Sequence, residues 1–179
     1  TNSTTYYWYV VPENTCAGTS ASGCSASATS FTTVGPPPPN DNCSGATAFG
    51  TIPTDGTCVT LSNQSTLAAT NSNVTPTGSC TSNSGTPDDD VWFSFVAPGP
   101  SVDLQATWVS GLTDVYWQVF SSTCGSSMTS ILCTDTDSGG TLNGLTTGNT
   151  YYIRLYTWAS SGSSVQNICL KTPPNMSYI

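Results

Sequence analysis

The chain has 179 residues, with 2 Lys and Arg against 10 Asp and Glu, which gives a formal net charge of −8. Charged residues make up 7% of the chain, against about 25% in an ordinary soluble domain, so uncharged polar groups must cover its surface. So few cations exclude nucleic acid and anionic membrane surfaces as partners, because both require basic patches. No apolar run approaches the roughly 18 residues of a membrane span, so no membrane insertion is expected.

The residue types of common catalytic sites are scarce. The chain contains no His and a single Glu, Glu13. It therefore lacks the commonest general base, the Ser–His and Cys–His pairs, and the ligands of most zinc and copper sites. The acids fall in short predicted loops, which does not resemble the carboxylate pair of a glycosidase. We expect a protein that is not an enzyme.

Proline runs divide the chain. Four prolines at 36–39 predict a semi-rigid linker over residues 35–41, and a proline pair at 173–174 opens a tail over 173–179. Residues 1–34 are too few for an independent core and predict a β-hairpin, whereas residues 42–172 suffice for a whole domain.

Short runs of Thr, Val, Tyr and Trp between turn residues predict an all-β fold. The expected strands are 5–11, 25–32, 57–62, 91–96, 101–108, 114–120, 129–133, 141–145, 150–158 and 165–171. They predict an antiparallel two-sheet β-sandwich, Ig/fibronectin-like or jelly-roll-like, of about eight or nine strands, preceded by the N-terminal hairpin. The expected core contains Trp92 or Phe93, Phe95, Leu104, Trp108, Val119, Ile153 and Leu155.

Two sequence patterns bear on the ends of the sandwich. The spacing Leu145-x-x-Gly148-x-x-Tyr151 predicts a tyrosine corner, in which the phenol hydroxyl bonds to backbone upstream. Residues 4–10 resemble residues 149–155, and a further strand follows each copy. Residues 1–33 are therefore expected to be the last two strands of a sandwich.

Eight cysteines, an even number in an acidic Ser/Thr-rich chain, indicate disulfides formed in an oxidising compartment. Spacing across predicted hairpin loops favours the local pairs Cys16–Cys24 and Cys124–Cys133. The other four cysteines allow three pairings, of which we favour Cys43–Cys58 with Cys80–Cys169.

Several segments carry a family resemblance. They include 39–43 (Pro-Asn-Asp-Asn-Cys), 90–95 (Asp-Val-Trp-Phe-Ser-Phe) and 148–152 (Gly-Asn-Thr-Tyr-Tyr). On these, residues 36–174 resemble a tandem β-sandwich repeat of large secreted surface proteins of Bacteroidota type, and residues 1–33 resemble the end of a fibronectin type III-like domain. The resemblance implies export by the type IX route, an extracellular or cell-surface location, and an excerpt or processed product of a longer protein.

The acidic residues suggest a cation site. Calcium takes several oxygen ligands, often from adjacent loops. We therefore consider structural calcium, the one cofactor expected if there is any, on Asp88, Asp89, Asp90, Asp135 and Asp137. The alternative is that these are solvated turn acids, with the 88–90 run acting as a charged guard before an apolar strand.

Aromatic side chains suggest a binding surface. Tyr152 and Tyr156 share one strand face, and Trp158 follows them. Flat aromatic rings stack on sugars, so this group would bind a glycan or a protein partner. The alternative is packing in the core or between domains, where aromatic residues also dominate.

The N-terminal ribbon suggests self-association, because an isolated hairpin is marginal in water and exposes its edges. We expect Tyr6, Trp8 and Val10, with Met176 and Tyr178 of the tail, to join subunits head-to-tail into a homopolymer; the alternative is a ribbon folded back on its own sandwich. The preferred function is therefore a non-enzymatic structural or adhesive module of a cell-surface fibre. The alternative function is a carbohydrate- or surface-binding module of a larger secreted protein.

Overall fold

The computed structural model describes residues 4–8, 29–78, 85–121 and 123–174, and it divides the chain into two compact units, Thr1–Pro36 and Pro37–Ile179. Within these described residues, no helix is long and apolar enough to cross a membrane. Some residues of the sequence predictions lie outside the described ones: Val10, Cys16, Cys24, Cys80, Met176 and Tyr178.

The first unit contains one antiparallel strand pair, β1 (Thr5–Trp8) with β2 (Thr29–Thr32). Tyr6 lies opposite Phe31, and their rings stack at 5.3 Å between centroids. The hydroxyls of Thr5 and Thr32 share a hydrogen bond of 2.8 Å across the pair. Aromatic side chains of this pair, including Tyr6 and Trp8, are exposed.

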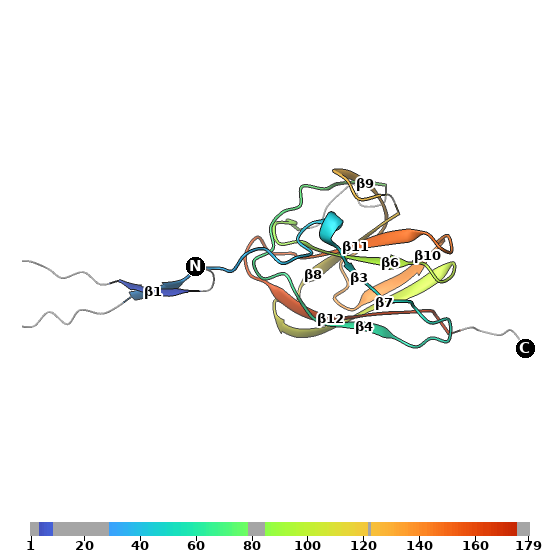
Figure 1. Ribbon diagram of the computed structural model, residues 1–179, viewed down its shortest axis with the longest axis horizontal. Helices are drawn as coiled ribbons and strands as arrows, with labels where there is room; N and C mark the ends of the chain where they lie inside the picture. The colour runs from blue at the N-terminus through green and yellow to red at the C-terminus, as the bar shows by residue number, and fades with distance from the viewer. Residues whose placement is uncertain (1–3, 9–28, 79–84, 122, 175–179) are drawn as a thin grey trace, which may run out of the picture. The chain divides into compact units, whose positions relative to one another are not determined.

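The second unit is a β-sandwich of two sheets (Figure 1). One sheet has the order β10-β7-β12-β4 and the other the order β3-β6-β11-β8-β9-β5. The strands are β3 (Thr47–Ala48), β4 (Val59–Ser65), β5 (Thr75–Gly78), β6 (Val91–Val96), β7 (Ser101–Gly111), β8 (Val115–Phe120), β9 (Ser127–Thr134), β10 (Gly139–Asn143), β11 (Thr150–Thr157) and β12 (Ser164–Lys171), with a 3-10 turn η1 (Cys43–Gly45) before them. The predicted two-sheet sandwich is confirmed. The pairings are antiparallel except at two edges, β3 with β6 and β5 with β9.

Alternating side chains fill the space between the sheets. Val102 and Leu104 of β7 and Ile168 and Leu170 of β12 point inward from the smaller sheet, and they are at most 1% exposed. The larger sheet contributes Val91, Phe93 and Phe95, Val115, Trp117 and Val119, and Tyr151, Ile153 and Leu155. A second cluster on the outer face of that sheet contains Trp92, Phe120 and Met128 with Cys43 and Val74.

One predicted core residue lies elsewhere. Trp108 is 50% exposed, although it continues the alternation of Val102 and Leu104. The burial alternation of β7 stops before this residue, and the register with β12 shifts beside it, between Val165 and Gln166. The core side of β7 therefore ends at Ala106, one inward-facing position earlier than the sequence pattern predicts.

The disulfides differ from the predicted pairs. Cys43 bonds to Cys124, 81 residues away, and Cys58 bonds to Cys169, 111 residues away. The predictions Cys43–Cys58, Cys80–Cys169 and Cys124–Cys133 are therefore wrong, although Cys133 is also disulfide-bonded. Strand pairing explains one bond: Cys169 lies opposite Thr60 in the register of β12 with β4, two residues from Cys58. Closeness in sequence misled the predictions Cys43–Cys58 and Cys124–Cys133, because the true partners are 81 and 111 residues apart.

The resemblance between residues 4–10 and 149–155 does not extend to topology. β1 pairs directly with β2. By contrast, β11 lies between β6 and β8 in the larger sheet, and β12 belongs to the smaller sheet. The two copies are therefore not two instances of one strand pair.

Candidate functional site

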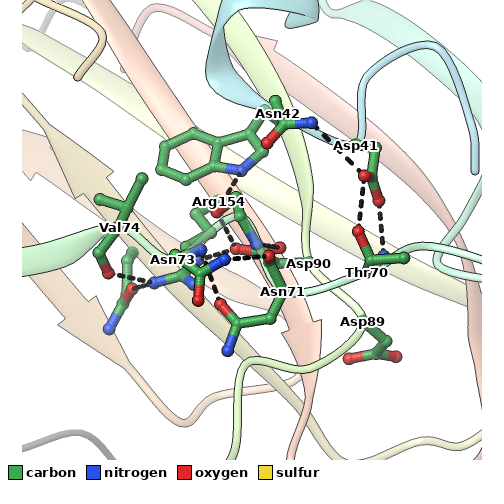
Figure 2. Close-up of polar contacts among 12 residues, drawn as sticks. Asp41, Asn42, Thr70, Asn71, Asn73, Val74, Asp89, Asp90 and Arg154 are labelled. Carbon is green, nitrogen blue, oxygen red and sulfur yellow. Dashed lines mark hydrogen bonds and ion pairs between the residues drawn. The ribbon is translucent and has the colours of Figure 1, made fainter. Parts of the chain in front are cut away.

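Three buried aspartates clamp loops onto the sandwich, each through one Ser or Thr. In every case the carboxylate accepts both the backbone N–H and the side-chain hydroxyl of the same residue. The pairs are Asp41 with Thr70 (2.5 and 2.8 Å), Asp90 with Ser72 (2.9 and 2.5 Å) and Asp89 with Thr157 (both 3.0 Å). Figure 2 shows Asp41 directed at Thr70 in this way. The first two pairs hold the segment between β4 and β5.

Arg154 joins the Asp90 pair from the outward face of β11, and it is fully buried. Its Nε forms an ion pair with Asp90, and its Nη1 donates to the Val74 carbonyl (3.4 Å) and to Gln118 Oε1 (3.2 Å) (Figure 2). A buried charge is tolerated only when it is paired and hydrogen-bonded in this manner.

Two aromatic rings enclose the guanidinium group. Its carbon lies 5.5 Å from the ring centroid of Trp92 and 5.4 Å from that of Tyr156, which is within cation–π range. Trp92 Nε1 also donates to Ser72 Oγ at 3.2 Å, which joins the indole to the Asp90 clamp. Tyr156 is fully buried, so this member of the predicted binding group is a packing residue.

Burial sets the proton affinity of this network. It raises the pKa of the Asp89 carboxyl above 3.8, and the hydrogen bonds from Thr157 oppose the rise only in part. It raises the pKa of Asp90 in the same direction, against the opposing effect of the Arg154 guanidinium and Ser72. Burial also raises the pKa of Tyr156 far above its ordinary value, so its phenol stays neutral. These directions follow from desolvation of the charged forms.

The aspartates of the predicted calcium site have other partners. Asp89 and Asp90 bind Thr157, Ser72 and Arg154, and Asp137 Oδ1 accepts the N–H of Val115 at 3.3 Å. The Asp90 carboxylate is ion-paired with the Arg154 guanidinium. Across the described part of the chain, no three His, Cys, Asp or Glu side chains gather as a metal site, and this includes Asp88 and Asp135. The described acids thus do not form the predicted site.

Tyr152 lies at a small depression near the start of β11. The depression has a volume of about 290 Å³ and is lined by Tyr152 with Ser121, Thr123, Asn149 and Thr150. Tyr152 is half-buried and packs against the outer cluster of the larger sheet. The lining therefore combines an aromatic ring, an amide and three hydroxyls, and includes no charged side chain.

The sequence identified Tyr152 but not its neighbours. Ser121 and Thr123 follow β8, and Asn149 precedes β11, so the depression forms where two connections meet beside adjacent strands. The strand register that brings these connections together is not visible in a single sequence. Trp158 of the predicted group lies beyond the opposite end of β11 and is 41% exposed.

Comparison with known proteins identifies one family. A family model described as galactose binding domain-like, of a type associated with type IX secretion, matches residues 39–170. The match covers nearly all of the second unit, including the depression at Tyr152. No curated protein and no solved structure matches the chain.

Proposed function

Because this chain belongs to the galactose binding domain-like family associated with type IX secretion, we propose that it is a carbohydrate-binding module of a secreted surface protein. The depression at Tyr152 would hold the sugar. The observation that carries this proposal is the aromatic ring beside an amide and three hydroxyls, in a concave place within the matched residues.

The chemistry of the lining suits a sugar. An aromatic ring offers a flat apolar face on which the C–H groups of a pyranose can pack. The Asn149 amide supplies both donors and an acceptor, and the hydroxyls of Ser121, Thr123 and Thr150 supply either. A volume of about 290 Å³ is at the low end for ligand sites, which suits one sugar unit rather than a long segment.

The family match favours the function that the sequence ranked second. A galactose-binding-like domain is a binding module, and the association with type IX secretion agrees with an extracellular or cell-surface location. It gives no support to a fibre subunit joined head-to-tail. The proposal assigns no catalytic step, in agreement with the scarcity of catalytic residue types.

A glycan array followed by titration calorimetry tests the proposal. We expect the wild-type protein to bind at least one neutral glycan, and Tyr152→Ala to weaken that affinity about tenfold or more, since truncating a binding aromatic has effects of that size. Tyr152→Phe should bind nearly as well, because it keeps the ring. The matched control is Tyr7→Ala, which removes an exposed tyrosine from the first unit. Wild-type affinity in Tyr152→Ala, or no bound glycan at all, would contradict the proposal.

A further inference from the structure

Two exposed tryptophans flank one turn at the end of β11 opposite Tyr152. Trp108 lies near the end of β7 and is 50% exposed, and Trp158 directly follows β11 and is 41% exposed. Both connect to the turn between β7 and β8: Trp108 Nε1 donates to the Gly111 carbonyl at 3.3 Å, and the Trp158 N–H donates to the Asp114 carbonyl at 3.1 Å. We call this place the tryptophan end.

The structure holds both residues in place while leaving the rings exposed. The hydrogen bond of its own Nε1 ties the Trp108 indole to the turn. Gly85 lies close against Trp158, because a Cβ at Gly85 would come within 3.3 Å of Cε3 and 3.1 Å of the tryptophan Cα. Any other residue at 85 would push against the indole, and φ of +75° further favours glycine there. Fixed aromatic rings lose little conformational freedom when a ligand binds.

A second glycine closes the turn against the neighbouring loop. Gly111 has φ of +82°, and a Cβ there would lie 2.2 Å from the Ser163 carbonyl oxygen. The N–H of Leu112 donates to that same carbonyl at 2.8 Å. The β7–β8 turn and the β11–β12 loop therefore form one surface, which places both tryptophans at the same end of the sandwich.

The polar rim of this surface consists mainly of hydroxyls. Residues 110–114 and 158–163 contribute five Ser and Thr side chains, one carboxylate from Asp114 and no basic side chain. Around the turn the exposed large apolar side chains are Trp108, Val109 and Trp158, among the residues that the structure describes. A stable protein interface buries roughly 800 Å² of surface per partner and packs apolar side chains at its centre, and three scattered apolar side chains form no such centre. Isolated aromatic rings among hydroxyls suit a hydroxylated polymer better.

We propose that the tryptophan end is a second glycan-binding surface, which takes a neutral polysaccharide chain across the indole rings of Trp108 and Trp158. It does not depend on the Tyr152 depression, from which β11 separates it. The net charge of −8 disfavours an anionic polymer and the absence of a basic rim gives such a polymer no partner. A module with two such places would bind two glycan segments at once and gain avidity for a polysaccharide surface.

Affinity electrophoresis through gels that contain neutral galactomannan, dextran or anionic polygalacturonate tests this proposal. We expect a neutral polymer to retard the wild-type protein, and Trp108→Ala/Trp158→Ala to raise the apparent Kd about tenfold or more. Trp108→Phe/Trp158→Phe should retain most of the binding, and Tyr7→Ala all of it. Tyr152→Ala should still be retarded, which separates this surface from the proposed site at Tyr152.

Fluorescence quenching tests the same surface without truncating it. In a Trp8→Phe background, acrylamide should reach only Trp108 and Trp158 among the described tryptophans, because Trp92 and Trp117 are fully buried. A neutral polymer should protect this fluorescence from quenching. Four results would each overturn the proposal. In electrophoresis they are unchanged retardation of the double alanine variant, retardation by polygalacturonate alone, and no retardation by either neutral polymer. In fluorescence it is a lack of protection from acrylamide. The proposal would also be overturned if the double alanine variant lost self-association, measured by sedimentation, while its binding to the polymer stayed intact.

Discussion

The hydroxyl oxygen of Tyr151 accepts a hydrogen bond from the backbone N–H of Thr146 at 2.8 Å. This confirms the tyrosine corner predicted from the Leu145-x-x-Gly148-x-x-Tyr151 spacing. Gly148 lies at φ of +84°, where glycine is unstrained, and this allows the chain to turn back before β11. The ring of Tyr151 stacks on Phe95 at 5.6 Å between centroids, so one side chain joins the loop to the core.

Removing that hydroxyl should lower stability while leaving the fold intact. We expect Tyr151→Phe to reduce the free energy of unfolding by about 1 kcal/mol, because the Thr146 N–H loses its partner while the ring packing remains. Urea denaturation at constant pH measures the difference. Tyr152→Phe is the matched control and should change little, since the neighbouring tyrosine is partly exposed at the surface depression. Equal midpoints for the two variants would count against a stabilising corner.

The buried arginine should be costly to lose alone and less costly to lose with its partner. Arg154→Leu leaves the Asp90 carboxylate buried without a counter-ion, so we expect it to lower the free energy of unfolding by about 3–5 kcal/mol. Arg154→Leu/Asp90→Asn should recover part of that loss, because neither charge remains. Thermal melts of the two variants compare the effects. Additive losses would mean that the two residues act independently.

Peptide mapping should find the two long-range disulfides. Digestion without reduction should link the peptide of Cys43 to that of Cys124 and the peptide of Cys58 to that of Cys169. Removing either bond by paired serine substitutions should lower the free energy of unfolding by about 2–5 kcal/mol. A linked peptide joining Cys43 to Cys58 would contradict the structure.

Stability should increase as the pH falls from neutral. Burial raises the pKa of Asp89 and Asp90 in the folded state above the unfolded value near 3.8. The folded state therefore binds these protons more tightly, so their stabilisation is fully present below the unfolded pKa and is lost as the pH rises through the folded pKa. Asp55 would make stability fall at low pH, because hydrogen bonds from Thr57 lower its pKa. Its carboxylate is solvent-exposed, so we expect its effect on stability to be small. Melting temperatures between about pH 7 and about pH 4 should show the net rise.

Asp89→Asn should flatten that pH dependence. The amide keeps an acceptor for the Thr157 N–H, and its NH₂ group can donate to the Thr157 hydroxyl, which itself donates to the Ala159 carbonyl at 3.2 Å. The hydrogen bonds to Thr157 therefore persist, while residue 89 no longer titrates. Asp114→Asn, at an exposed turn, is the control and should melt with the wild-type pH profile. An unchanged pH profile in Asp89→Asn would mean that another group governs the transition.

The sequence predicted the strands whose side chains alternate. The expected range 91–96 is identical to β6, and 165–171 differs from β12 by one residue, because apolar residues at every second position are buried against the other sheet. The sequence missed β3 and β5. These edge strands pair in parallel with distant partners, and β5 contains Pro76 and ends at Gly78, both unfavourable for a strand. These two strands form because β6 and β9 offer backbone partners, and not because their own sequences alternate.

The candidate site was less predictable than the fold. Asp89 and Asp90 attracted attention as an acidic run, but their partners Thr157 and Arg154 lie 68 and 64 residues away. Spacing cannot distinguish a carboxylate that binds a cation from one that clamps a loop. The alternation did place Tyr152 and Tyr156 on one face, yet the loops that cover one and leave the other open are set by tertiary packing.

The Cys58–Cys169 bond also determines how the module responds to mechanical tension. A pull on the two ends of the module is transmitted through this covalent link, so the 111 residues between the two cysteines cannot be drawn out. At about 3.4 Å per residue, the bond withholds on the order of 400 Å of contour length. If the proposed glycan binding takes place under shear, the module would then stay short and keep its two sheets paired.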